Sequence, residues 1–145
     1  MLHIRQDFPI NASARRVFDA VSTSTGLDSW WTKTCTGSPA EGAEYTLGFG
    51  PEYDWHAVVT QCIPELAFEI RLTKADSDWQ DSRVGFELTE NNGSTMVKFQ
   101  HVGWPEANEH YWISCLCWAR YLELLKRYVE AGETVPYETR LDGAL

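Results

Sequence analysis

Residues 111–129, YWISCLCWARYLELLKRYV, decide the fold of this chain. Apolar side chains recur here at alternating steps of four and three, a spacing that puts them on one face of an α-helix. The residues on this face are Tyr111, Cys115, Trp118, Leu122, Leu125 and Val129. Charged residues such as Arg120, Glu123 and Arg127 fall mostly on the opposite side. We therefore predict an amphipathic helix that buries a broad apolar face against another layer.

Signals for both ends of this helix are present. Pro105 can start it at its first helical position, or Asn108 can cap it slightly later. Gly132 is placed to end it. The polar tail that follows, residues 133–145, is expected to be ordered only as far as it docks on the rest of the domain.

The chain upstream begins with one strand and two short helices. Apolar and polar side chains alternate from residue 2 to residue 8, which predicts a first strand ending at Pro9. Ser13 can cap a short helix, and a second short helix spans about residues 25–32. Glycine and proline in residues 36–44 predict turns.

Five further runs have strand character, with β-branched and aromatic residues or a period of two. They are residues 43–49, 55–63, 66–73, 83–89 and 95–102. Asn91, Asn92 and Gly93 predict a tight hairpin turn between the last two. Consecutive strands with short links predict an antiparallel meander.

These elements predict an α+β fold in a single domain, residues 1–145. Six strands and the long helix each have one apolar face, and both faces are buried if a curved antiparallel sheet wraps around the helix. Such a sheet contacts the helix closely along only part of its length. The space left over, closed by the two short helices, predicts a small-molecule cavity.

The charge of the chain excludes several partners. Formal net charge is −9, from 12 basic and 21 acidic residues, and no basic cluster is present to neutralise phosphates. We therefore expect no nucleic-acid partner and no binding to an anionic membrane. The chain also shows no secretory signal and no apolar run of membrane-spanning length.

The four cysteines, Cys35, Cys62, Cys115 and Cys117, are scattered and have no metal-binding spacing. Reduced thiols in a cytoplasmic protein are the expectation. Glu106 lies four residues before another potential ligand, His110, but such a pair is usually a solvated first helical turn. We expect no metal site and no cofactor.

Several segments, in this order, resemble a known family. They are INASARRVFDA at residues 10–20, the pair Trp30-Trp31, EGAEY at 41–45, VGFEL at 84–88, STMV at 94–97 and the helix at 118–132. Together with the element order they are similar to the START-like (SRPBCC, helix-grip) superfamily. Within it, the chain resembles proteins named for homology to the activator of the ninety-kilodalton heat-shock protein ATPase.

This resemblance implies a hydrophobic cavity between the sheet and the long helix, used elsewhere in the superfamily for lipids, sterols, polyketides and plant hormones. It does not imply one activity, because members include ligand carriers, aromatase/cyclases and co-chaperone domains. The fold alone does not choose among these functions.

Aromatic side chains are the main candidates for a ligand site. Seven Trp, six Tyr and six Phe exceed the need of a small core, although an aromatic-rich core is the alternative. The candidate lining consists of Trp31, Tyr45, Phe49, Trp55, Phe68, Phe86, Phe99, His101, Trp112, Cys115 and Trp118. Within the long helix we expect Trp112, Cys115 and Trp118 to border the space that remains.

His101 is the titratable residue of most interest. It alternates with Val97 and Phe99, which predicts that it faces inward beside the start of the long helix. There it could orient a polar ligand group or move a proton. A histidine that is simply hydrogen-bonded at the edge of the sheet is the alternative.

Three functions follow from these patterns. The first is binding of a small hydrophobic or aromatic ligand. The second is a cyclase-like or hydrolytic enzyme that uses His101, for which no second converging polar group is evident, so no catalytic residue is assigned. The third is an interaction domain in which Ile113 and Leu116, outside the main apolar face, contact a heat-shock protein, as the resemblance implies, or a second copy in a homodimer.

Overall fold

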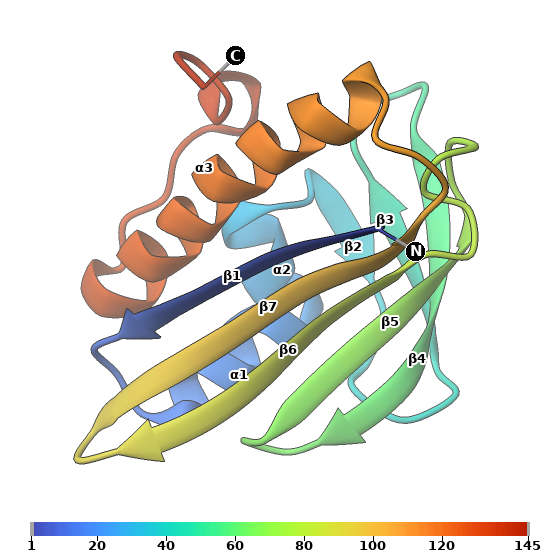
Figure 1. Ribbon diagram of the computed structural model, residues 1–145. Helices are drawn as coiled ribbons and strands as arrows, with labels where there is room; N and C mark the ends of the chain where they lie inside the picture. Colours follow the sequence, from blue (N-terminus) through green and yellow to red (C-terminus); the bar gives the residue numbers. More distant parts are fainter. Residues whose placement is uncertain (1, 145) are drawn as a thin grey trace.

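A curved antiparallel sheet packs its concave face against a long C-terminal helix in the computed structural model, which describes residues 2–144 (Figure 1). In chain order the elements are β1 (Leu2–Ile10), α1 (Ala14–Ser22), α2 (Ser24–Trp30), β2 (Thr34–Thr36), β3 (Glu44–Gly48), β4 (Asp54–Ile63), β5 (Ala67–Lys74), β6 (Arg83–Asn91), β7 (Ser94–Trp104), α3 (Glu109–Ala131) and the 3₁₀ turn η1 (Tyr137–Thr139). The predicted α+β helix-grip architecture is confirmed.

The sheet has the order β1-β7-β6-β5-β4-β3-β2, so the first strand pairs with the last and the rest form a meander. The prediction of six strands was one short. The missed strand, β2, has three residues and one buried side chain, Cys35, which is too short for an alternation to be visible. β1 also continues past Pro9 to Ile10, which is possible because β1 is an edge strand.

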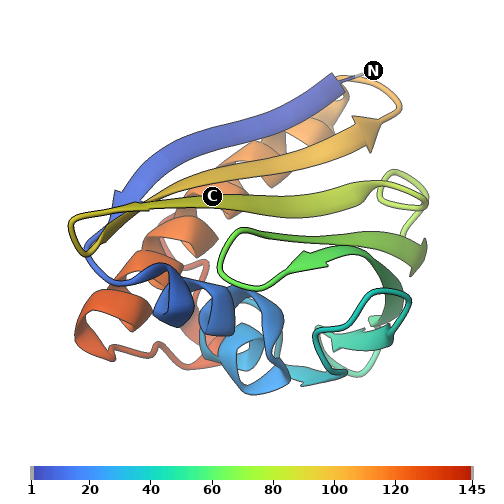
Figure 2. The same ribbon diagram turned by 90° about the horizontal axis from the view of Figure 1, so that it is seen from below.

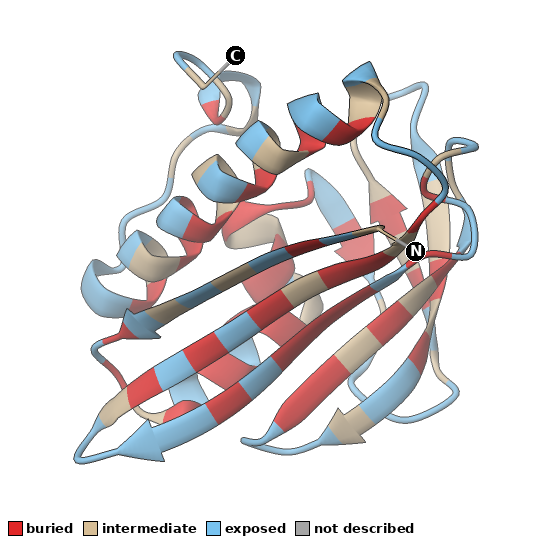
Figure 3. Cartoon of the chain, viewed as in Figure 1, coloured by how far each residue is buried: buried red, intermediate tan, exposed pale blue. Residues whose placement is uncertain are grey.

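The long helix α3 crosses the concave face of the sheet, with α1 and α2 beside it (Figures 1 and 2). Its inner side is buried and its outer side exposed, while burial alternates along the strands (Figure 3). Of the two predicted starts, Asn108 is the N-cap, and its side chain accepts a hydrogen bond from the backbone N–H of Tyr111 at 2.9 Å. Gly132 ends the helix with φ 69°, as predicted.

His101 on β7 joins the first half of α3 to the sheet. Its Nδ1 accepts hydrogen bonds from two indole N–H groups, that of Trp104 at 3.2 Å and that of Trp118 on α3 at 3.1 Å. Its Nε2 lies 2.8 Å from the Ser82 hydroxyl, which donates to the carbonyl of Trp79. Because the indoles can only donate and the hydroxyl hydrogen is already used, His101 carries its proton on Nε2.

The ring of His101 is fully buried among Trp79, Trp104 and Trp118. Burial, with a smaller effect from the nearby His110, lowers the pKa of His101 from its ordinary value of 6.5 to about 3. The ring is therefore neutral at physiological pH, as a hydrogen-bond acceptor from two indoles must be.

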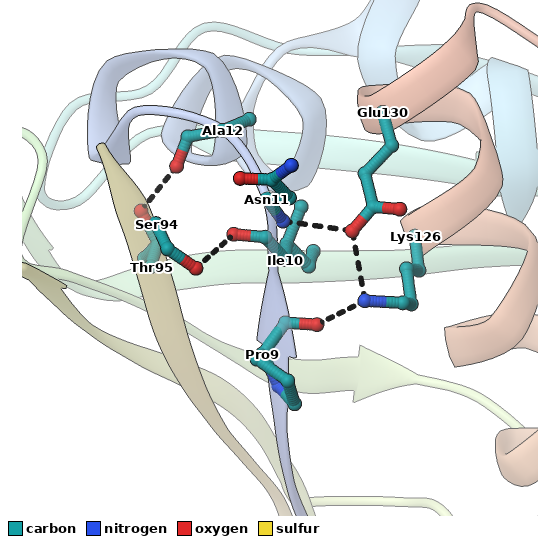
Figure 4. Close-up of polar contacts among 8 residues, drawn as sticks. All are labelled: Pro9, Ile10, Asn11, Ala12, Ser94, Thr95, Lys126 and Glu130. Atoms are coloured by element: carbon teal, nitrogen blue, oxygen red, sulfur yellow. Dashed lines mark hydrogen bonds and ion pairs between the residues drawn. The ribbon is translucent and has the colours of Figure 1, made fainter. Parts of the chain in front are cut away.

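The other end of α3 is held by a polar cluster at the corner between β1 and α1 (Figure 4). Glu130 accepts from the backbone N–H of Asn11 at 2.7 Å and from Lys126 at 2.8 Å, and Lys126 also donates to the carbonyl of Pro9 at 2.6 Å. In the same corner Thr95 donates to the carbonyl of Ala12 at 2.7 Å. The helix is thus attached to the sheet at two places, through the neutral hydrogen bonds of the buried His101 and through the charged Lys126 and Glu130.

The neutral His101 predicts a loss of stability in mild acid. The pKa of His101 is lower in the folded protein than in the unfolded chain. Its contribution to the free energy of unfolding is therefore complete above pH 6.5, the ordinary histidine pKa, and is lost as the pH falls below that value. Between pH 6.5 and pH 5 the free energy of unfolding should fall by about 2 kcal/mol. Chemical denaturation of the His101→Gln variant should lack this slope, and His56→Gln, at a half-buried histidine on β4, should keep it. An unchanged slope in His101→Gln would contradict the assignment.

The Glu130 carboxylate predicts a second, weaker dependence at lower pH. The backbone N–H of Asn11, and then Lys126, lower the pKa of Glu130. Its contribution is therefore present at pH 7 and is lost as the pH falls through the glutamate range. Glu130→Gln should lower the free energy of unfolding by about 1 kcal/mol at pH 7. The difference from wild type should shrink by pH 3. Glu87→Gln, at an exposed carboxylate on β6, should change stability by less than about 0.5 kcal/mol.

Candidate functional site

A cleft of about 230 Å³ opens where the first half of α3 diverges from the sheet. Its walls come from five segments: the end of α2, the β3–β4 loop with the start of β4, the β5–β6 loop, α3 and the C-terminal tail. On α3 it is lined by His110, Ile113, Ser114, Cys117, Trp118 and Tyr121. The spacing of these residues corresponds to one face of the helix.

Five aromatic rings form a closed circuit around this cleft, each in contact with the next. Their centroids are separated by 5.3 Å (Trp31–Phe49), 5.2 Å (Phe49–Trp55), 5.1 Å (Trp55–Trp79), 5.8 Å (Trp79–Trp118) and 5.2 Å (Trp118–Trp31). We call these residues the aromatic circuit. Contacts of this kind stabilise a preformed wall whose ring faces and edges suit a planar apolar group.

Trp79 adds an unsatisfied polar atom to this wall. The residue is 8% exposed, and its indole Nε1 is buried without a hydrogen-bond partner among residues 2–144. A buried donor without an acceptor costs free energy, and in a native structure it indicates a missing partner. Trp79 lines the cleft, so this unpaired N–H belongs to one of the wall residues.

A hydrogen-bonded pair, Asp78 and His110, lies beside the cleft. Nδ1 of His110, near the start of α3, lies 3.0 Å from Oδ2 of Asp78, and the Asn108 amide donates to the same oxygen at 3.2 Å. These two hydrogen bonds, that from His110 first, lower the pKa of Asp78. Asp78 and Trp79 belong to the same loop, so one loop supplies both a wall and a polar rim.

The C-terminal tail closes one side of the cleft. Arg140 is 5% exposed, and its guanidinium donates to the carbonyls of Asp28, Thr32 and Val135 at 2.7, 3.0 and 2.9 Å. The Tyr137 hydroxyl donates to the carbonyl of Phe49 at 2.9 Å. The docking expected of the tail therefore extends through η1, and it brings Tyr137 and Leu141 to the cleft.

Nine of the eleven predicted lining residues fall into three groups. Trp31, Phe49, Trp55 and Trp118 line the cleft. His101 lies beneath it, bonded to Trp118. The fully or nearly fully buried rings of the core between sheet and helices are Tyr45, Phe68, Phe86 and Phe99.

Trp112 and Cys115 do not border the cleft, contrary to expectation. Trp112 is 60% exposed, and Cys115 is half-buried. Because α3 approaches the sheet at an angle, the side that borders the cleft is displaced from the main apolar face and passes through Ser114 and Cys117. Burial raises the pKa of the Cys117 thiol, so this residue is a neutral part of the wall.

Sequence reasoning missed Trp79, His110 and Tyr137 as cleft residues. Trp79 stands alone in the polar stretch KADSDWQDS, residues 74–82, and a large ring in such a loop is itself a signal of burial. Nothing local marks His110 or Tyr137, since their positions depend on how the start of α3 and the tail dock.

The described part of the chain gives little support for a metal site, a disulfide or a membrane-spanning helix. Residues 2–144 contain no group of three or more His, Cys, Asp or Glu side chains placed to hold a metal ion. Their four cysteines are free. None of the described helices has the length and hydrophobicity to cross a membrane.

Solved structures share this architecture. The Aha1 dimer from Colwellia psychrerythraea superposes with a TM-score of 0.82 at 25% identity, covering 92% of this chain and 99% of that chain. Protein MLL2253 from Mesorhizobium loti gives 0.78 at 16% identity, with 91% and 99% covered. CalU16 from Micromonospora echinospora gives 0.67 at 19% identity, with 90% and 76% covered. The last two likenesses show the fold alone.

No curated protein matches the chain. A family model does, over residues 11–130, which include both short helices, the whole meander and nearly all of α3. This chain therefore belongs to the family described as Activator of Hsp90 ATPase homolog 1-like protein.

Proposed function

We propose that this protein binds a small aromatic or hydrophobic ligand in the cleft beside α3. The observation that carries the proposal is the aromatic circuit with the unpartnered indole N–H of Trp79 in its wall. A volume of about 230 Å³ is small for a ligand site, which favours a molecule of one or two fused rings. Free thiols support a reducing, cytoplasmic location.

The geometry gives less support to an enzyme that uses His101. Both ring nitrogens are engaged, the ring is fully buried, and its lowered pKa leaves it a weak base. A general base must reach the proton that it removes, and His101 lies behind Trp79 and Trp118. Its hydrogen bonds instead support a structural role beneath the ligand site.

Filling the cleft should weaken ligand binding. Cys117 lines the cleft and is half-buried, so Cys117→Phe places a ring in the space that a ligand would occupy. Calorimetric titration with 2-methoxynaphthalene should give one site per chain in the wild type and an affinity lower by about tenfold or more in Cys117→Phe. Ala119→Phe, on the exposed side of the same helix, is the matched control and should bind as wild type. Failure of the wild type to bind, or equal effects of the two variants, would contradict the proposal.

A second candidate function is self-association through the outer side of α3. Trp112, Ile113 and Leu116 are 60%, 38% and 52% exposed and form an apolar patch next to the cleft. The relative from Colwellia psychrerythraea was solved as a dimer, which supports a homodimer here. A heat-shock protein partner at the same patch is the alternative that the family name raises.

A charged substitution in this patch should dissociate a homodimer. Sedimentation velocity should show a concentration-dependent dimer for the wild type and a monomer for Leu116→Glu, because a carboxylate would be buried unpaired in the interface. Leu66→Glu, at an equally exposed leucine in the β4–β5 turn, should remain dimeric. A wild type that stays monomeric at all concentrations would exclude the homodimer, and a pull-down with the heat-shock protein would then test the alternative.

A further inference from the structure

The contact between Asp78 and His110 is not needed to cap the start of α3. The N-cap role belongs to Asn108, whose Oδ1 accepts from the backbone N–H of Tyr111. The amide Nδ2 of Asn108 donates to Oδ2 of Asp78 at 3.2 Å, and Nδ1 of His110 lies 3.0 Å from the same oxygen. The carboxylate is thereby fixed from two sides against the ring.

This contact determines which nitrogen of His110 is available. An ionised carboxylate only accepts hydrogen bonds, so Nδ1 of His110 carries a proton. In the neutral ring Nε2 is then a lone-pair acceptor, and it has no partner among residues 2–144. The tautomer is the reverse of that of His101, in which Nδ1 is the acceptor and is already used.

His110 is also placed where an acceptor would meet a ligand. It lines the cleft, its side chain is 38% exposed, and its ring packs edge-on against Trp104 at 5.4 Å. The rest of the wall is mainly aromatic and aliphatic, so a few polar groups must set the orientation of anything bound. Trp79, in the same wall, contributes a second polar group without a hydrogen-bond partner among residues 2–144, its indole N–H.

We propose that the Asp78–His110 pair recognises a hydroxyl group: Nε2 of His110 accepts a hydrogen bond from the O–H of a phenol or other hydroxylated aromatic ligand in the cleft. The inference rests on the proposed function and names the ligand class. Asp78 acts as a positioning residue, because it holds the tautomer in which Nε2 accepts. Asp76 also lines the cleft, and its proximity favours a neutral hydroxyl over an anionic ligand.

A pair of probes that differ only at the hydroxyl separates recognition from shape. 2-Naphthol and 2-methoxynaphthalene have the same rings, but only the first can donate a hydrogen bond. Calorimetric titration of the wild type should show 2-naphthol binding about five- to tenfold more tightly, the gain typical of one hydrogen bond.

Variants of Asp78 and His110 then test whether this pair causes the preference for 2-naphthol. His110→Phe keeps a ring of similar shape without an acceptor, so it should bind the two probes with equal affinity. Asp78→Asn should reduce the preference, because an amide can donate to Nδ1 and convert Nε2 into a donor. His56→Phe, at a half-buried histidine on β4 outside the cleft, should keep this preference. Thermal unfolding of each variant checks that it is folded.

The outcomes distinguish this inference from the function on which it rests. Equal affinity of the wild type for both probes, or a preference that persists in His110→Phe, would overturn hydroxyl recognition and leave the aromatic cleft standing. No binding of either probe to the wild type would overturn both. A purely structural role of the pair would lower the melting temperature of His110→Phe without changing the ratio of the two affinities.

Discussion

The rest of the structure depends on a neutral histidine that accepts two indole hydrogen bonds inside the core. His101 belongs to β7, and Trp118 belongs to α3, so one hydrogen bond connects the sheet with the helix packed on its concave face. The third partner, Ser82, precedes β6 and fixes the other side of the ring. Such a network contributes only while every polar atom is paired, and that requires an uncharged ring with its proton on Nε2. The attachment of α3 is therefore polar in mechanism although it lies among tryptophans.

The cleft follows from where this attachment lies. Glu130 and Lys126 hold the C-terminal half of α3 close to the β1–α1 corner, while His101 holds Trp118 near the middle of the helix. The turns of α3 that precede Trp118 diverge from the sheet. The β5–β6 loop and the C-terminal tail fill only part of the space between them. Trp118 thus has two functions, since its indole N–H secures the helix and its ring belongs to the aromatic circuit.

The sequence predicts the architecture well because local patterns carry it. The apolar face of residues 111–129, the cap at Asn108 and the Asn91–Gly93 turn all appear in the structure as expected. The candidate site is only partly predictable. Alternation shows that Phe99 and Trp55 face inward, but it does not show that Phe99 lies in the core and Trp55 in the cleft. Trp112 was misplaced because the angle of α3 to the sheet is a tertiary property, and the Asp78–His110 contact spans 32 positions in the chain.

The protonation state of His101 tests this account most directly. Two-dimensional ¹H–¹⁵N spectra of the imidazole rings, recorded from pH 7 to pH 5, report which nitrogen carries the proton. We expect one histidine to stay neutral throughout, with its proton on Nε2, and to disappear from the spectra of His101→Gln. A His101 ring that becomes doubly protonated near pH 6, or that carries its proton on Nδ1, would contradict the hydrogen bonds from Trp104 and Trp118 and with them the attachment of α3 to the sheet.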